Sequence, residues 1–251
     1  MSLLSLTQVR IPLYLYDVQK QFKTNYYMFH HSHPYEPYFP EGATKLIVGT
    51  LPPPRFTVGQ FKEGDVDFCY GSISGLLWPV LDRIFELKLD YETTESAIEQ
   101  RKAFLKSRGI GICDIVASCQ RTKIDASDLG MENIELRDLI GFLKKYKRID
   151  TLLFTGGNSK NGPEYFFRKH LKECNLKLEL LTNDIPRIHQ FQLLDDEEAT
   201  ATRTIKTVSL TAPSGAANRA IGSMELYKHL KNKNPEFNTI DFRVLQYKKF
   251  F

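Results

Sequence analysis

The sequence predicts an α/β protein, a three-layer sandwich with a central, mainly parallel four-stranded sheet. Short apolar runs alternate with longer segments of helical period, and strands separated by helices form a parallel sheet covered on both faces. Two of the runs, KLIVGTLPPP at 45–54 and TVSLTAPSGAAN at 207–218, end in loops rich in Gly, Pro, Ser and Thr. Because open α/β sheets bind ligands at the carboxyl ends of their strands, we expect these two loops to meet at the functional site.

The predicted elements follow in chain order. Residues 1–44, rich in Tyr, Phe, Pro and His without a clear period, indicate an N-terminal arm packed on the domain. Apolar runs predict strands at 45–49, 110–116, 151–155 and 206–210, with a further strand around 177–181. Helical patterns predict helices at 76–87, 93–107, 133–147, 163–173 and 219–231.

Two segments complete this organisation. The segment 182–204 contains a run of acidic residues and little apolar content, which predicts an exposed excursion or hairpin. The tail 235–251 predicts a short C-terminal helix that starts near Asn238 or Thr239 and docks on the core.

The composition fits a single domain over residues 1–251, since 42% of the residues are hydrophobic and 25% are charged. No apolar run approaches the roughly 18 residues that span a membrane, and no signal peptide is recognisable, so we expect a cytoplasmic protein. The net charge of +4 and the pI near 8.7 permit nucleic-acid binding without demanding it.

The cysteine and histidine patterns indicate neither a metal nor a cofactor. The cysteines are widely spaced with no CxxC pair, as expected of reduced thiols: Cys69, Cys113, Cys119 and Cys174. His30, His31 and His33 lie on an arm where Glu36 is the only nearby acidic ligand, which is a poor set for zinc.

Five segments carry a family resemblance. They are GTLPPP at 49–54, FCYGSISGLLWPVL at 68–81, GICDIVASCQRTKIDASDL at 111–129, LLFTGG at 152–157 and LTAPSGAANR at 210–219. Taken in this order, over about residues 45–231, they resemble the uracil-DNA glycosylase superfamily, and most closely its hypoxanthine-DNA glycosylase branch. The most specific of them is the block that begins at Asp114.

The resemblance implies a monomeric DNA glycosylase of base-excision repair. Such an enzyme flips a deaminated or modified base out of DNA, holds it in a pocket and hydrolyses its N-glycosidic bond. The implied base pocket consists of Gly49, Thr50, Leu51, Phe68, Tyr70, Gly71 and Asp114. Phe68 stands where relatives place the aromatic ring that stacks on the flipped base; the alternative is a core Phe.

Asp114 stands where many relatives carry an Asn that reads the edge of uracil. An ionised carboxylate only accepts hydrogen bonds, so Asp114 favours a base edge that presents N–H donors. A turn Asp without a ligand is the alternative interpretation. The implied DNA contacts lie in the two loops: Pro52, Pro53, Arg55, Pro213, Ser214, Gly215, Asn218 and Arg219.

The chain departs from the family at the usual catalytic positions. Leu51 stands where relatives place a residue that activates water, and Ala212 where they place one that stabilises the leaving base. Gly75 stands near the position of an Asn in the hypoxanthine branch. Asp65 and Asp67, in the loop before Phe68, are the candidate substitute acids, with exposed loop residues as the alternative.

Two other functions remain open. One is a non-catalytic nucleic-acid-binding module that kept the pocket and lost the water-activating side chains. The other is a hydrolase of free nucleosides or other small N-glycosides. Neither the glycosylase nor these alternatives calls for a cofactor or a membrane.

Overall fold

The computed structural model describes residues 28–195 and 202–251. Its main sheet is mixed and six-stranded, in the order β3-β2-β6-β9-β8-β7. The strands are β2 (Lys45–Val48), β3 (Ile110–Ile112), β6 (Thr151–Phe154), β7 (Glu179–Thr182), β8 (Arg187–Leu194) and β9 (Thr202–Ser209). The pairs β2–β3, β2–β6 and β6–β9 are parallel, whereas β8 and β7 extend the sheet in antiparallel fashion. The predicted α/β class is therefore confirmed, with a larger, mixed sheet.

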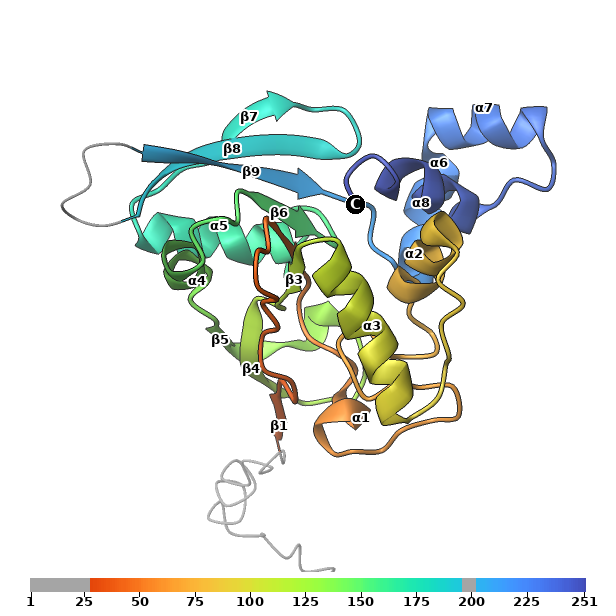
Figure 1. The fold of residues 1–251 in the computed structure, drawn as a ribbon, viewed down its shortest axis with the longest axis horizontal. Coiled ribbons are helices and arrows are strands. Elements are labelled where there is room, and N and C mark those ends of the chain that lie inside the picture. The colour runs from red at the N-terminus through yellow and green to blue at the C-terminus, as the bar shows by residue number, and fades with distance from the viewer. Residues whose placement is uncertain (1–27, 196–201) are drawn as a thin grey trace, which may run out of the picture.

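The side chains of the strands alternate between two helical layers. In β2, Leu46 and Val48 join the core with α4 (Leu139–Lys145) and α5 (Pro163–Glu173). Ile47 joins the other core, with α2 (Leu77–Phe85), α3 (Glu95–Ser107) and Tyr247 of α8 (Thr239–Tyr247). This alternation follows from the period of two in a strand. Figure 1 shows α4 and α5 on one side of β6, and α2 and α3 on the other.

Local sequence accounts for several helix ends. The Thr94 hydroxyl accepts from the N–H of Ala97 at the start of α3, and Pro163 occupies the first turn of α5, where its missing N–H is not needed. Asn238 and Asp241 form a capping box at the start of α8. The helices predicted at 76–87, 93–107 and 163–173, and the tail helix near Asn238, correspond to α2, α3, α5 and α8.

Three predicted elements differ from the structure. The run 110–116 ends as β3 at Ile112, and β4 (Val116–Arg121) joins a second, three-stranded antiparallel sheet with β1 (Phe29–Ser32) and β5 (Glu132–Leu136). The predicted helix 133–147 begins with β5, and α4 starts only after Asp138, whose side chain accepts from the N–H of Gly141. The predicted helix 219–231 is two helices, α6 (Asn218–Ser223) and α7 (Glu225–Lys233), because Met224 is extended.

The segment 182–204 is a hairpin whose strands belong to the main sheet. Strand β8 pairs with β9 from Arg187 opposite Ser209 to Leu194 opposite Thr202, and residues 196–201 lie outside the described residues. The prediction of a hairpin is therefore confirmed, and its two strands, β8 and β9, extend the main sheet.

The described part of the N-terminal arm, residues 28–44, is built into the fold. Strand β1 pairs with β4, with Phe29 opposite Arg121 and Ser32 opposite Ser118. The bridge between Tyr38 and Ile112 adds a second attachment, to β3. The arm therefore reaches the carboxyl end of β3, where Asp114 follows; residues 1–27 lie outside the described residues.

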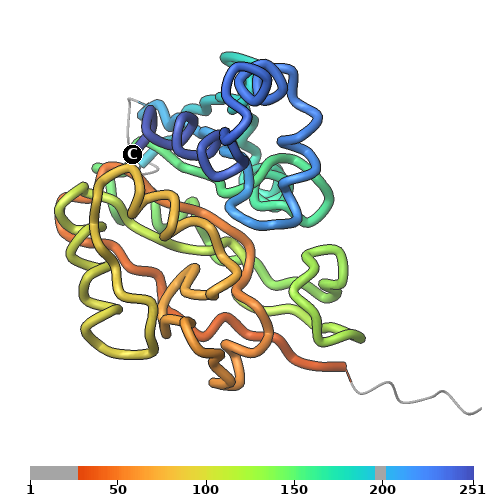
Figure 2. The backbone as a smooth tube through the Cα atoms, turned by 90° about the vertical axis from the view of Figure 1, so that its right-hand side faces the viewer, coloured from red at the N-terminus to blue at the C-terminus, as the bar shows by residue number. Residues whose placement is uncertain are grey.

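The C-terminal tail docks at the opposite edge of the sheet. Lys45 at the start of β2 donates to the carbonyl of Phe250 (2.6 Å), and Arg108 donates to Phe251 (2.7 Å). Figure 2 shows the end of the chain lying against this part of the N-terminal half. Within residues 28–195 and 202–251, no helix has the length and apolar character needed to cross a membrane.

Candidate functional site

The main cavity lies at the carboxyl ends of β2 and β6. After β2 the chain continues to β3 on one side, and after β6 it continues to β9 on the other, so a crevice opens between the two strands. The cavity measures about 710 Å³, within the range of small-ligand sites. Its walls are Thr50–Pro53, Tyr70–Ser72, Ser74, Gly75, Asp114, Asp125–Asp128, Thr155 and Ala212–Ala216. The two loops singled out in the sequence thus line one cavity.

Asp114 is a buried carboxylate, 5% exposed, with a partner for each oxygen. Its Oδ1 accepts from the N–H of Gly49 (3.1 Å), and its Oδ2 lies 3.0 Å from Nε2 of His33. The N–H of Tyr35 donates to Nδ1 of His33 (3.1 Å), so the proton of a neutral imidazole is on Nε2 and is donated to Asp114. Asp114 is therefore held as a hydrogen-bond acceptor.

Gly49 lies behind this carboxylate in a position that admits no side chain. A Cβ on Gly49 would collide with the hydroxyl of Tyr70 and would lie 2.6 Å from Oδ1 of Asp114. The close approach of the backbone to these two groups explains why a glycine follows β2.

Tyr70 is the aromatic side chain of the cavity wall. Its hydroxyl makes a hydrogen bond of 2.9 Å with Oγ1 of Thr155, at the end of β6. Burial, together with the charge of Asp114, raises the pKa of Tyr70 well above its usual value, so the phenol stays protonated. Its φ of +58° is unusual for a bulky residue and fixes the ring in a sharp loop.

Phe68 lies outside this wall. It is 7% exposed and belongs to the core with Trp78, and its ring contacts those of Tyr35 and Tyr38 with centroids 6.5 and 6.4 Å away. Of the two aromatic residues predicted for the base pocket, the structure thus brings Tyr70 to the cavity and places Phe68 in the core. Gly71, beside Tyr70, lines the cavity with it.

Asp65 and Asp67 also lie outside the cavity wall. Asp65 is fully buried, and its oxygens accept from Arg55 (2.8 and 2.9 Å) and from the N–H groups of Lys62 and Ile73 (both 2.8 Å). Burial opposes ionisation, but these hydrogen bonds prevail and lower the pKa of Asp65. Asp67 accepts from the hydroxyl of Tyr35 (2.8 Å). Arg55 is therefore already paired with a carboxylate, and Asp65 holds the loop 62–73 together.

The second loop is held by the C-terminal helix. Arg243 of α8 is fully buried and donates to the carbonyls of Ala212 (3.0 Å) and Ser214 (2.8 Å) and to Oδ1 of Asn218 (3.0 Å). A backbone bridge joins Ser214 to Gly75 of the other wall. Pro213, Ser214 and Gly215 line the cavity, whereas Asn218 is engaged by Arg243 and Arg219 is exposed outside the wall.

The sequence analysis did not single out Asp128 as a site residue. Its Oδ1 accepts from the hydroxyl of Thr50 (3.0 Å), and its side chain lines the cavity. Burial raises the pKa of Asp128 to about 6, against the hydrogen bond from Thr50 and the charge of Arg121. Asp128 belongs to the quoted block 111–129, but only the fold shows that it faces the first loop.

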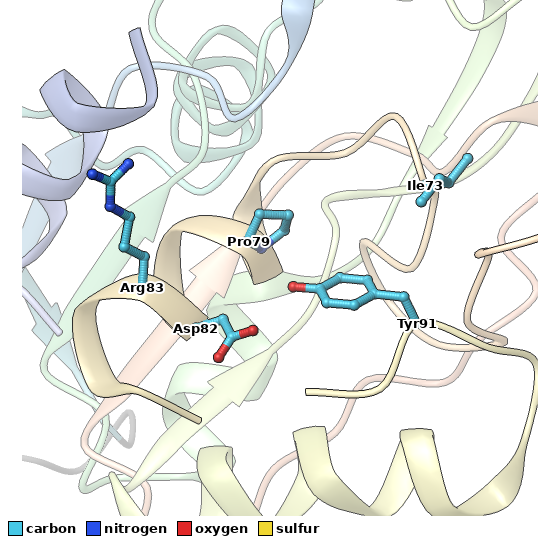
Figure 3. A pocket seen from close by; sticks show the side chains of 5 residues that line it. All are labelled: Ile73, Pro79, Asp82, Arg83 and Tyr91. Atoms are coloured by element: carbon cyan, nitrogen blue, oxygen red, sulfur yellow. The ribbon is translucent and has the colours of Figure 1, made fainter. Parts of the chain in front are cut away.

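Two further hollows adjoin this region. One of about 360 Å³ shares Thr50, Asp128, Thr155 and Ala212 with the main cavity and extends along the loop after β6 to Arg187. The other, shown in Figure 3, lies beside α2, with the hydroxyl of Tyr91 directed toward that helix. In the hollow beside α2, Asp82 accepts from the backbone N–H of Lys88 (2.7 Å), and Arg83 forms an ion pair with Asp241 (2.7 Å). Both charged side chains of this hollow therefore already have partners.

The contact of His31 with Arg121 and the burial of three of the four cysteines indicate structural roles for these residues. Nδ1 of His31 accepts from Arg121 (2.7 Å), and burial with the charge of Arg121 lowers its pKa to about 4. The four cysteines are free, and Cys174 alone among them is exposed. In the portions of the chain that the structure describes, no group of three or more His, Cys, Asp or Glu side chains is placed to hold a metal ion.

No protein-family model, curated protein or solved structure was found to match this chain.

Proposed function

We propose that this chain is a DNA glycosylase-like hydrolase that flips a deaminated or modified base into the main cavity and hydrolyses its N-glycosidic bond. One observation carries the proposal: a buried acceptor, Asp114, is fixed at the carboxyl edge of the sheet, in a cavity of about 710 Å³. A site that recognises a base needs a shaped pocket with a few fixed polar groups. The parallel pairing of β3, β2, β6 and β9 is compatible with the four-stranded sheet that the family resemblance implies.

The fixed polarity of Asp114 defines the kind of base. Both oxygens already accept hydrogen bonds from the protein, and a carboxylate oxygen can accept a second one, here from a donor on the ligand. A base edge with an N–H or an exocyclic amine is therefore favoured, and a carbonyl oxygen at this point is repelled. A deaminated purine such as hypoxanthine offers a ring N–H beside a single carbonyl, whereas the N–H of uracil lies between two carbonyls, so hypoxanthine is repelled less by Asp114.

The remaining wall suits the sugar and the phosphates. Pro52, Pro53, Pro213, Ser214 and Gly215 present small or rigid surfaces around the opening, and Lys62 and Arg219 are exposed near the same loops. Phosphate contacts from such cations position a strand without reading its sequence. We propose that the protein acts as a monomer in the cytoplasm, without a metal or a cofactor.

The test is a glycosylase screen under single-turnover conditions. Duplex and single-stranded oligonucleotides carrying uracil, hypoxanthine, xanthine or an alkylated base are incubated with excess protein, and abasic sites are then cleaved with alkali. We expect strand cleavage with at least one modified purine. Absence of cleavage with every base would contradict the proposal.

A non-catalytic nucleic-acid-binding module is the second candidate. It is favoured by Leu51, which lines the cavity where the family's water-activating residue is expected and cannot polarise water. If the screen shows no cleavage but the protein binds an abasic or hypoxanthine duplex more tightly than a normal one, this candidate replaces the enzyme. Binding of free nucleosides without any binding of DNA indicates instead a hydrolase of small N-glycosides.

A further inference from the structure

Asp128 differs from the buried carboxylates near the site in having an oxygen without a hydrogen-bond partner. Asp114 and Asp65 have partners for both oxygens, whereas only Oδ1 of Asp128 accepts a hydrogen bond, from Thr50 (3.0 Å). Within residues 28–195 and 202–251, Oδ2 of Asp128 has no hydrogen-bond partner. A half-buried carboxylate with a free oxygen on a cavity wall is available to a ligand or to water.

Asp128 and Asp114 are attached to consecutive residues of the first loop. The N–H of Gly49 holds Asp114, and the hydroxyl of Thr50 holds Asp128. The Nδ2 group of Asn161 donates to the carbonyl of Asp128 (2.8 Å), which fixes the 3₁₀ turn Asp128–Gly130 from the other side. The positions of the two carboxylates are therefore fixed relative to each other. Asp114 is the acceptor for the base, and Asp128 lies beside it.

The position of Asp128 also suits a water molecule. Thr50, Asp128 and Thr155 line both the main cavity and the adjoining hollow of about 360 Å³, so they form the border between the two. A base held against Asp114 occupies the main cavity, and the adjoining hollow gives water access to Asp128. Leu51, the next residue of the loop, cannot position water itself.

We propose that Asp128 is the general base that activates the attacking water, a role that rests on the glycosylase function proposed above. The water oxygen forms a bond to C1′ of the sugar while its proton passes to the Asp128 carboxylate. The C1′–N bond breaks, and its electron pair leaves with the base, which takes up a proton from solvent. The proton on Asp128 then returns to solvent, and the atoms and charges balance.

The electrostatic surroundings define the expected pH dependence. Burial raises the pKa of Asp128 to about 6, opposed by the hydroxyl of Thr50 and by Arg121 of β4, and supported by the charge of Asp114. Cys119 also lies within the electrostatic reach of Asp128, and Arg121 is shared with Asp125 (3.8 Å) and with His31. A general base must be ionised, so the rate is expected to fall as the pH drops through about 6.

The test compares Asp128→Asn with Asp150→Asn in the full chain. Asn keeps an oxygen that accepts from Thr50 but cannot take a proton at neutral pH, and Asp150 is an exposed carboxylate just before β6, at the end of the sheet opposite the cavity. With the modified base that the wild type cleaves, Asp128→Asn is expected to lower the single-turnover rate by about 10²–10⁴-fold. DNA affinity, measured by fluorescence anisotropy, is expected to stay unchanged, and Asp150→Asn is expected to behave as wild type.

The pH profile separates a catalytic role from a structural one. Wild type is expected to lose about tenfold in rate per pH unit below about pH 6, as a single required carboxylate dictates, and Asp128→Asn to show no such dependence. Thermal unfolding checks that each variant folds, and Asp128→Glu, which keeps the carboxylate, is expected to recover part of the rate.

Three outcomes overturn the inference. The first is a folded Asp128→Asn that retains the wild-type rate. The second is a folded variant that loses rate but keeps the wild-type pH profile. The third is a wild type that cleaves no base, which removes the proposed function itself, whereas the first two leave that function standing.

Discussion

Gly49 shows how much of the site depends on one missing side chain. Its N–H holds Asp114, and the space beside its Cα is filled by the hydroxyl of Tyr70. The backbone, an acidic side chain and an aromatic side chain thus pack closely together at Gly49. Asp114 and Tyr70, packed against Gly49, therefore define both the polarity and the shape of this part of the cavity, which we call its floor.

Replacing Gly49 with Ala is expected to destabilise the fold by about 1–3 kcal/mol, the usual cost of overpacking a tight site. The added methyl collides with Tyr70 and Asp114, both of which must move. Chemical denaturation measures the loss. Gly222→Ala is the matched control, because a Cβ there meets nothing within 4 Å. Equal stability of the two variants would show that the floor of the cavity is not tightly packed.

Phe68→Ala tests whether this ring serves the core or the ligand. Removing a buried Phe costs about 3–5 kcal/mol of stability, because it leaves a cavity. Since Phe68 lies in the core and outside the cavity wall, we expect this loss with unchanged DNA affinity of the folded protein. A stable variant whose affinity for a modified-base duplex falls by the roughly 1–3 kcal/mol typical of base stacking would assign Phe68 to the ligand.

The C-terminal helix α8 contributes more to the site than its place at the end of the chain suggests. Arg243 donates to Ala212 and Ser214, Gln246 accepts from the N–H of Thr211 (2.8 Å), and Tyr247 donates to the carbonyl of Thr211 (2.6 Å). Since loop backbones need partners when they are not exposed, α8 supplies the contacts that hold residues 211–218 in place.

Arg243→Met is expected to destabilise the fold by about 1–3 kcal/mol, because the carbonyl of Ala212 loses the donor from this buried side chain and that of Ser214 keeps only the N–H of Ala217. DNA affinity should fall as well, since the second loop loosens. Arg83→Met is the control: Arg83 is 56% exposed, and its ion pair with Asp241 on α8 is expected to contribute less than about 1 kcal/mol. Similar losses for both variants would mean that Arg243 does not organise the loop.

Sequence patterns predicted the elements with strong local signals and failed where long-range contacts decide. Pro163, Thr94 and Asn238 mark helix starts that the structure confirms. The run 110–116 is apolar on both sides of Asp114, so its pattern could not show that β3 ends at Ile112 and that β4 pairs with β1. A buried Arg243 was equally hidden, because an arginine in a polar helix is usually exposed.

The same limit applies to the site. Asp114, Tyr70 and the two loops could be predicted because they lie at strand ends or in a recognisable motif. His33 reaches Asp114 from an arm with no clear period, and Asp128 faces the cavity because Thr50 holds it. Contacts between residues so far apart in the sequence depend on how the two sheets pack, which one sequence does not show.

At the scale of the whole molecule, the cavity lies at the carboxyl edge of the main sheet, and the C-terminus docks at the opposite edge. Lys62 and Arg219, the cations expected to contact DNA, lie in loops at the carboxyl edge. Lys172, in the last turn of α5, belongs to the other, because a helix that follows a parallel strand runs back along the sheet.

DNA binding is expected to weaken steeply with salt, because each phosphate contact releases counterions. Lys62→Ala and Arg219→Ala should each reduce the slope of log affinity against log salt by about 1. Lys172→Ala should leave the slope unchanged. Fluorescence anisotropy over a range of salt concentrations measures all four proteins. If all three variants have the wild-type slope, the proposed DNA face is wrong.

The most direct measurement is the ratio of base release from hypoxanthine and uracil duplexes by wild type and by Asp114→Asn. Liberated free base is quantified by mass spectrometry under single-turnover conditions. If Asp114 reads the base edge, wild type releases hypoxanthine in preference to uracil, and Asp114→Asn shifts the ratio toward uracil, because an amide can donate to a carbonyl that a carboxylate repels. An unchanged ratio in a folded variant, or release of neither base by either protein, would contradict a role of Asp114 in base recognition.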